Sequence, residues 1–313
     1  MVRVVFFGNS ASNFTARHFE ALLAAPAKLV GVVDVPAVRR ETTNPLQDSL
    51  PVLAKEAHLL DIPFIEPERS DEAGFFATLR ELQPDLFIAV GYALILKAQL
   101  LAVPRLMAVN FHASLLPEYR GKHPVFWTLR NAERWAGLSA HVMDRGIDTG
   151  DLIYQVKVRT RRDDSVASLY ERIMARSLPL VERLVVDAAQ GSIHRRPQPE
   201  GSGSYYSGTT DEDFRLDWNW SAEKIRHYIT VTPGRCFVEL KEGRLYFIDA
   251  RSEVFTEAVM PGNLLRIGRS RAVVAANPGA ISIGQVQIGE CQAESMAAFC
   301  RSRGMAPGDV LDG

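Results

Sequence analysis

The chain has 313 residues, a length that accommodates one large domain and a smaller one. Hydrophobic residues make up 47% of it and charged residues 23%, as in ordinary globular proteins, and no apolar run approaches the roughly 20 residues of a membrane-spanning helix. The net charge of −1 and the isoelectric point near 6.7 give no overall reason to expect a nucleic-acid partner, although a local basic patch remains compatible with them.

The N-terminus and the cysteines indicate the cellular setting. The chain goes straight from its first methionine into a short apolar strand, without the charged region and long apolar core of a signal peptide. Its three cysteines, Cys236, Cys291 and Cys300, have no metal-type spacing, and an odd number argues against a disulfide framework. We therefore expect a reduced, cytoplasmic protein without a bound metal or a membrane partner.

The first 90 residues predict the opening of a Rossmann-like α/β domain with a mostly parallel sheet. Strand and helix patterns alternate, with strands at residues 2–7, 29–33, 62–65 and 86–90 and helices at residues 14–23, 50–60 and 73–82. The turn after the first strand contains Gly8 but no Gly-x-Gly-x-x-Gly pattern. A dinucleotide cofactor is therefore poorly supported.

A pair of polar residues ends the strand predicted at residues 106–111. Asn110 and His112 are two positions apart, so their side chains point to the same face of that strand. This is the carboxyl end of a strand, where open α/β sheets bind their ligands. Asp148 lies in a glycine-bracketed turn between two further predicted strands, and such a turn can bring its carboxylate back over the pair.

The three residue types have complementary chemistry. An imidazole transfers protons near neutral pH, a carboxylate orients it and stabilises its charged form, and an amide N–H donates to a developing oxyanion. No serine or cysteine nucleophile is indicated beside them, so the set favours direct acyl transfer between two bound molecules. Taken singly, each residue also has an ordinary structural interpretation, and Asp148 in particular has that of a turn former. His141, on the adjacent predicted strand, is an outside candidate.

The longer motifs resemble those of the formyltransferases that use 10-formyltetrahydrofolate. Asn-x-His is followed by Ser-Leu-Leu-Pro-x-Tyr-Arg-Gly and later by Gly-Ile-Asp-Thr-Gly-Asp. The resemblance implies that Asn110, His112 and Asp148 are catalytic and that 10-formyltetrahydrofolate is the formyl donor. It further implies a set of donor-binding residues, namely Gly91, Tyr92, Leu94, Ser114, Leu115, Leu116, Pro117, Asp144, Gly146 and Ile147.

The second half of the chain predicts a change of architecture. One long amphipathic helix is expected over residues 166–189, and residues 191–210, rich in glycine, proline and serine, are expected to form a linker. This divides the chain into a catalytic domain at 1–190 and a C-terminal domain at 211–313. Five short strands separated by turns suggest an OB-like barrel there, at residues 236–240, 245–248, 264–267, 272–275 and 281–288.

The acceptor amine has two interpretations. The resemblance to methionyl-tRNA formyltransferase spans nearly the whole chain, including its final Pro-Gly-Asp-Val-Leu. That branch carries a basic insertion near residues 35–50, where this chain has only Arg39 and Arg40 among acidic neighbours, whereas phosphate binding needs clusters of Lys and Arg. Tyr119 and residues 123–127 also resemble the small-molecule branch. We therefore favour a small-molecule amine, such as a nucleotide-linked amino sugar or an amino acid, with initiator tRNA as the alternative.

Two other functions receive less support. The hydrolase of 10-formyltetrahydrofolate shares the Ser-Leu-Leu-Pro loop but uses a cysteine after its fourth long strand, where this chain has Gly91 and Tyr92. Those two residues also have a plain interpretation as a strand-to-helix connection. A non-catalytic folate-binding protein would not need all three polar residues. Homodimerisation through the C-terminal domain is compatible with the pattern, which does not require it.

Overall fold

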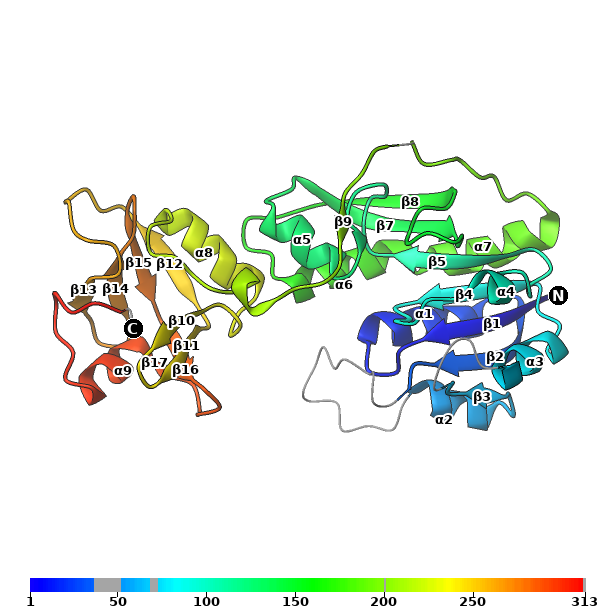
Figure 1. Ribbon diagram of the computed structural model, residues 1–313, viewed down its shortest axis with the longest axis horizontal. Helices are drawn as coiled ribbons and strands as arrows, with labels where there is room; N and C mark the ends of the chain where they lie inside the picture. The colour runs from blue at the N-terminus through cyan, green and yellow to red at the C-terminus, as the bar shows by residue number, and fades with distance from the viewer. Residues whose placement is uncertain (37–51, 68–72, 200, 312–313) are drawn as a thin grey trace. The chain divides into compact units, whose positions relative to one another are not determined.

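The computed structural model describes residues 1–36, 52–67, 73–199 and 201–311, which fold into two compact units (Figure 1). The first unit contains Met1–Val125, Trp135–Arg159 and Tyr170–Ser207, and the second contains Phe126–Arg134, Thr160–Leu169 and Gly208–Gly313. The domain limits predicted at residues 190 and 211 stay a prediction. The segment with Arg39 and Arg40, on which the acceptor argument drew, lies outside the described residues.

A seven-stranded sheet with the order β3-β2-β1-β4-β5-β7-β8 forms the centre of the first unit. Its strands are β1 (Val2–Gly8), β2 (Ala27–Asp34), β3 (Phe64–Ile65), β4 (Leu86–Val90), β5 (Met107–His112), β7 (Trp135–Val142) and β8 (Leu152–Arg159). The strands from β3 to β5 pair in parallel, and β7 and β8 add antiparallel pairs. The predicted Rossmann-like, mostly parallel sheet is confirmed, and the apolar runs of β1 and β4 are almost wholly buried, as sheets covered on both faces require.

Helices lie between most of these strands in the chain, and two more follow β8 (Figure 1). Their bounds are α1 (Asn13–Ala24), α2 (Val52–Leu59), α3 (Ala73–Glu81), α4 (Ala98–Leu101), α5 (Pro124–Arg130), α6 (Val166–Ser177) and α7 (Pro179–Gln190). The prediction of one helix over residues 166–189 was wrong, because the chain starts a new helix at Pro179. Proline has no N–H to donate to the preceding turn and its ring clashes with it, whereas it fits the first position of a helix.

His18 on α1 makes the stability of the fold depend on pH. It is fully buried, with Nδ1 2.7 Å from the Phe14 carbonyl oxygen and Nε2 2.9 Å from Ser177 Oγ, and burial lowers its pKa to about 4. As the pH falls below about 6.5, the unfolded chain binds a proton that the folded chain does not. The free energy of unfolding should therefore fall by about 2 kcal/mol between pH 7 and pH 5.

Replacing His18 by phenylalanine should remove this part of the pH dependence, whatever it does to stability at one pH. The check is urea denaturation of both proteins at the two pH values. If the difference between pH 7 and pH 5 is the same in the His18→Phe variant, His18 is not its source.

The second unit contains two four-stranded sheets, ordered β10-β11-β16-β17 and β12-β15-β14-β13. Their strands are β10 (Phe237–Leu240), β11 (Gly243–Phe247), β12 (Ala250–Glu253), β13 (Leu264–Ile267), β14 (Ala272–Ala275), β15 (Ala280–Ile283), β16 (Gln285–Ile288) and β17 (Glu294–Ser295). The strand predicted at 281–288 is two strands, which separate at Gly284. β12 was not predicted because its sequence, Ala-Arg-Ser-Glu, has no apolar alternation.

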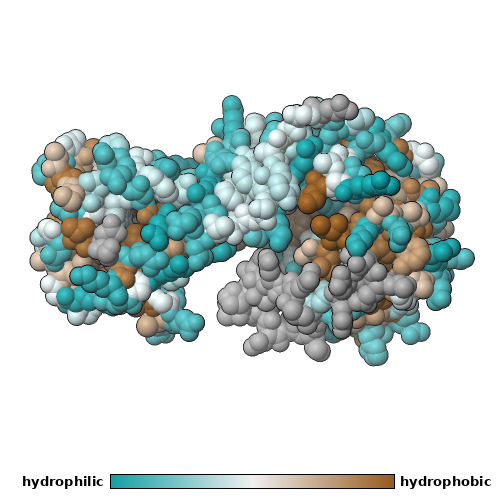
Figure 2. Space-filling model, viewed as in Figure 1, coloured by the Kyte–Doolittle hydropathy of each residue, from teal (hydrophilic) through white to brown (hydrophobic). Residues whose placement is uncertain are grey.

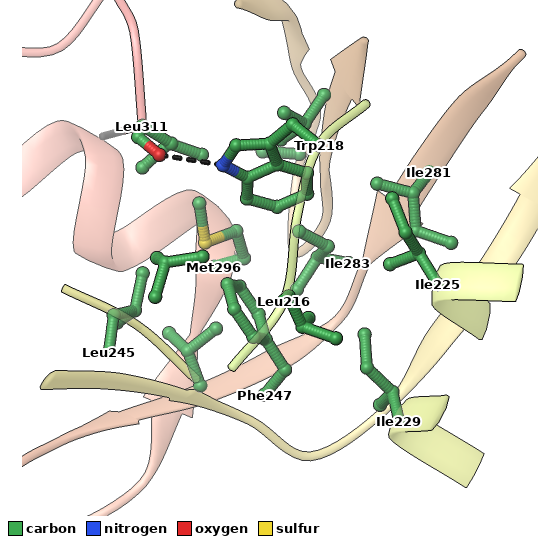
Figure 3. Packing of buried hydrophobic residues seen from close by; sticks show 14 of the residues in the cluster. Leu216, Trp218, Ile225, Ile229, Leu245, Phe247, Ile281, Ile283, Met296 and Leu311 are labelled. Carbon is green, nitrogen blue, oxygen red and sulfur yellow. Dashed lines mark hydrogen bonds between the residues drawn. The ribbon is translucent and has the colours of Figure 1, made fainter. Parts of the chain in front are cut away.

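The hydrophobic core of this unit is closed by helices α8 (Ala222–Val231) and α9 (Met296–Ser302) (Figure 3). Trp218 lies in it, and its indole N–H donates to the Leu311 carbonyl 2.8 Å away (Figure 3). A buried indole needs such a partner. The bond therefore ties the end of the described chain to the core.

On the face in Figure 2, hydrophilic residues cover most of the described surface, and hydrophobic residues emerge in separate groups. Within the described ranges, every helix is too short or too polar to cross a lipid bilayer. The described residues likewise contain no cluster of three or more His, Cys, Asp or Glu arranged to hold a metal ion.

Candidate active site

The end of β5 carries the two polar residues that the strand pattern singled out. β5 lies between β4 and β7, and its apolar residues are buried, which fixes the strand and the face that each side chain takes. Asn110 is half-buried and His112 is buried. In the register of the sheet, Asn110 is opposite Ala89 on one side and His141 on the other.

Asp148 comes back over this strand end from the loop between β7 and β8. Its Oδ1 accepts a hydrogen bond of 3.1 Å from Asn110 Nδ2, and its Oδ2 lies 3.5 Å from His112 Nδ1. Oδ2 also accepts a hydrogen bond of 2.9 Å from the Gly121 N–H. The structure thus brings Asn110, His112 and Asp148 together, as the two separate motifs predicted.

The hydrogen bonds define the protonation of His112. Its Nε2 lies 2.8 Å from the carbonyl oxygen of Tyr119, which can only accept, so Nε2 carries the hydrogen and Nδ1 faces Asp148. Burial lowers the pKa of His112, against the opposing effects of the Asp148 carboxylate and the Tyr119 carbonyl. At neutral pH, Nδ1 therefore carries no hydrogen, and its lone pair, which lies beside the carboxylate, can accept a proton.

Asp148 is held in its ionised form. Burial alone would raise the pKa of its carboxyl, but His112, His141 and the Gly121 N–H outweigh burial and hold the pKa well below its usual range. The carboxylate side chain is only 11% exposed. A charge in such a place acts strongly on its neighbours, because water screens it little.

His141 is a fourth polar member of the cluster. Its Nδ1 lies 2.9 Å from the Val142 carbonyl oxygen and must carry a hydrogen, while its Nε2 lies 3.2 Å from Asn110 Nδ2 and 3.3 Å from Asp148 Oδ1. A neutral His141 accepts a hydrogen bond from Asn110, and a protonated one donates to Asp148. From the sequence, His141 was only an outside candidate, because its position next to Asn110 depends on the pairing of β7 with β5.

The loop after β5, predicted to contact the formyl donor, is shaped by hydrogen bonds of its own. Ser114 Oγ donates to the Glu118 carbonyl at 2.7 Å, and the Leu116 N–H donates to Ser139 Oγ at 3.0 Å. The Leu116 carbonyl accepts from Gln155 Nε2 at 2.9 Å. The other two predicted residues of this loop are half-buried, namely Leu115 and Pro117.

The predicted segment after β4 lies beside the same strand end, because Val90 pairs in register with Phe111. Gly91 has a φ of +65°, and a Cβ there would lie 2.9 Å from a threonine hydroxyl on α1, so this position needs glycine. Tyr92 and Leu94 are half-buried. The Tyr92 hydroxyl is buried and has no hydrogen-bond partner among the described residues.

The third predicted donor-binding segment is an exposed turn. Asp144 Oδ1 accepts hydrogen bonds from the Gly146 N–H at 3.0 Å and from Thr149 Oγ1 at 2.7 Å, so this carboxylate shapes the turn. Ile147 is 41% exposed, which leaves its apolar side chain available to a ligand. The structure therefore gives Asp144 and Asp148, in one short loop, different surroundings.

The amino-acid sequence matches two family profiles, one described as "Formyl transferase" over residues 2–181 and one described as "Formyl transferase, C-terminal domain" over residues 209–304. The methionyl-tRNA formyltransferase of Pelotomaculum thermopropionicum is 30% identical, over 99% of this chain and 98% of the relative. The protein of the same name from Pseudomonas paraeruginosa is 31% identical, over 99% of each chain.

Solved structures share the fold. The N-formyltransferase from Helicobacter canadensis, in complex with folinic acid and dTDP-3-aminofucose, has a TM-score of 0.65 at 20% identity, with 92% of this chain and 100% of that chain covered. HypX from Aquifex aeolicus, in complex with tetrahydrofolic acid, has a TM-score of 0.63 at 17% identity, with 95% of this chain and 46% of that chain covered.

Proposed function

The chain belongs to the formyl transferase family, and from that premise we propose that it transfers the formyl group of 10-formyltetrahydrofolate to the amino group of methionyl-tRNA. Formyl transfer is supported mainly by the cluster of Asn110, His112 and Asp148 at the end of β5, in which His112 is buried and the other two are half-buried. The acceptor is supported by relatives named methionyl-tRNA formyltransferase, which match over 98–99% of their own length. We thus prefer initiator tRNA, the alternative acceptor in the sequence analysis, to the small-molecule amine favoured there.

The residues present fit the formyl donor. The donor supplies an activated formyl group, and it has a polar heterocycle that needs both hydrogen-bond partners and apolar contacts. Tyr92 offers a buried hydroxyl without a partner among the described residues, and Ile95 beside it is 67% exposed. We assign donor binding to this segment, to the Ser114–Pro117 loop and to Ile147.

The catalytic residues would act in sequence on the transferred group. Asn110 donates a hydrogen bond to the formyl oxygen as negative charge develops on it. The proton that the attacking amine loses enters the Asp148–His112 pair, and His112 returns it to the departing nitrogen of the donor. The amine must be neutral to attack, so activity should fall at low pH.

His141 bears on the first of these steps. In the structure, the Asn110 amide nitrogen faces both Asp148 Oδ1 and His141 Nε2, which occupies both of its hydrogens. Donation to the formyl oxygen therefore requires one of these two hydrogen bonds of Asn110 to give way when the donor binds.

A small-molecule amine is the second candidate acceptor, and the charge of the C-terminal third of the chain favours it. Residues 208–313 contain 12 Lys and Arg residues against 14 Asp and Glu residues. Proteins that bind nucleic-acid backbones usually have a basic surplus on the binding domain. An amino sugar or an amino acid, in contrast, does not require a basic surface on the C-terminal region.

An assay with two acceptor pools separates the candidates. The protein is given 10-formyltetrahydrofolate with methionyl initiator tRNA or with a panel of nucleotide-linked amino sugars and amino acids, and the mass gain of one formyl group is measured. We expect transfer to the tRNA, at a rate that falls steeply with salt, because phosphate contacts are screened. Transfer to small amines alone overturns the tRNA acceptor and leaves formyl transfer standing. Release of formate without a formylated acceptor overturns both.

A further inference from the structure

The segment after α7 makes contacts with the active site that its composition did not predict. Residues 196–199 and 201–206, which we call the return segment, lie within the stretch expected to be a linker, yet they belong to the first unit. Arg196 forms an antiparallel bridge with Leu152 at the start of β8. Farther on, β9 (Tyr205–Tyr206) pairs in parallel with β6 (Arg120–Gly121).

Gln198 is the most buried contact of the return segment with the catalytic loop. Its side chain is buried, and Nε2 donates to the carbonyl oxygens of Asp148 at 2.9 Å and Gly150 at 2.8 Å. Its Oε1 accepts from Arg120 Nη2 at 2.7 Å. Both amide hydrogens and the amide oxygen are thus used, which fixes the orientation of the amide group.

These bonds bear on the backbone conformation of Asp148. Asp148 has a φ of +56°, in the left-handed region that residues other than glycine seldom adopt. Such a conformation persists where the surroundings determine it, and here Gln198 holds the carbonyls on both sides of Thr149 while Arg120 Nε also donates to the Asp148 carbonyl at 3.2 Å. That backbone, together with the hydrogen bond from the Gly121 N–H, places the Asp148 carboxylate beside His112.

The far end of the return segment holds the partner of His112. Ser204 Oγ accepts a hydrogen bond of 2.9 Å from the Tyr119 N–H, and the ring of Tyr206 is stacked parallel to that of Tyr119, with centroids 5.7 Å apart. The Tyr119 carbonyl is the acceptor that faces His112 Nε2. One segment therefore positions both the backbone of Asp148 and the group that sets the tautomer of His112.

We propose that the return segment completes the active site and that Gln198 is a positioning residue, which orients the Asp148 carboxylate toward His112 for the reaction. This inference rests on the proposed formyl transfer. If Gln198 were merely structural, its replacement would lower stability and leave the turnover of the folded enzyme unchanged. If it is a positioning residue, its replacement lowers kcat while the protein stays folded.

The test is Gln198→Glu, which keeps the shape and the bond from Arg120 but removes both donated hydrogen bonds. Gln198→Met, of similar length and without polar atoms, is a second variant. Gln287→Glu is the matched control, because the Gln287 Nε2 also donates to a glycine carbonyl, that of Gly289 at 3.1 Å, in the second unit. Each protein is compared by thermal unfolding, by kcat and by the KM for 10-formyltetrahydrofolate.

We expect kcat to fall about 10- to 100-fold in both Gln198 variants, with the KM for the donor within about threefold of the wild type, because a misaligned catalytic group lowers turnover more than binding. Gln287→Glu should retain the wild-type kcat. Wild-type kcat in either folded Gln198 variant overturns the proposal, and so does a loss of activity that only tracks the loss of folded protein. An inactive wild type would instead contradict the proposed function.

Discussion

Replacing Asp148 by asparagine should lower kcat about 1,000-fold, while the protein stays folded. The asparagine side chain has the same shape and tolerates the left-handed backbone, but its amide cannot stabilise a protonated His112 3.5 Å away. It also puts an amide where Asn110 and the Gly121 N–H now meet a carboxylate. The measurement is the steady-state rate of formyl transfer.

Asp61→Asn is the control for this substitution. Asp61 also has a positive φ, of 53°, but it lies in an exposed turn. The same change of charge in the same backbone conformation should leave kcat unaltered there. If Asp148→Asn retained more than about a tenth of the wild-type kcat, the assignment of Asp148 to proton transfer would fail.

The second large effect is expected for Asn110→Leu. Leucine has the same branching, although it is bulkier, and it has no donor, so the developing oxyanion would lose its hydrogen bond, and such losses lower kcat about 100- to 1,000-fold. Since the bond forms mainly in the transition state, the KM for 10-formyltetrahydrofolate should change little. The two constants are measured together at saturating acceptor.

Asn13→Leu provides the comparison for Asn110→Leu, because Asn13 is exposed at the start of α1. It should retain the wild-type kcat. An Asn110→Leu enzyme with a higher KM and an unchanged kcat would assign Asn110 to substrate binding and not to the oxyanion.

Much of the fold and the centre of the site could be predicted because the signals are local. Buried parallel strands have continuous apolar runs, and the alternation of a strand puts Asn110 and His112 on one face without knowledge of its neighbours. The family resemblance, which the profile matches confirm, linked these two residues with Asp148. The mostly parallel sheet and the antiparallel C-terminal strands followed from the same kind of pattern.

What could not be predicted depends on pairing between distant segments. His141 reaches Asp148 through the register of β7 on β5, which no local pattern encodes. Gln198 lies in a stretch whose glycines and prolines indicate a linker, and its two bonds to the catalytic loop appear only when the chain is folded. Pro179 is a local signal for the break between α6 and α7, but the apolar stripe continues across it and suggested a single helix.

The choice between methionyl-tRNA and a small-molecule amine as acceptor is the finest distinction in the proposed function. A small-molecule amine was favoured because residues 35–50 contain no basic cluster beyond Arg39 and Arg40 and because Tyr119 and residues 123–127 resemble the small-molecule branch. The relatives that match over their full length are named methionyl-tRNA formyltransferase, and this supports the tRNA acceptor that we propose. The acidic balance of residues 208–313 keeps the small-molecule acceptor as a testable second candidate.

The central claim, formyl transfer by the cluster at the end of β5, is tested most directly by single-turnover stoichiometry. Excess enzyme is mixed with 10-formyltetrahydrofolate and acceptor, and tetrahydrofolate and formylated acceptor are counted over time in the wild type and in Asp148→Asn. We predict one formylated acceptor for each tetrahydrofolate formed by the wild type, and no comparable burst in the variant. Tetrahydrofolate formed with free formate, or an equal burst in both proteins, would contradict the account.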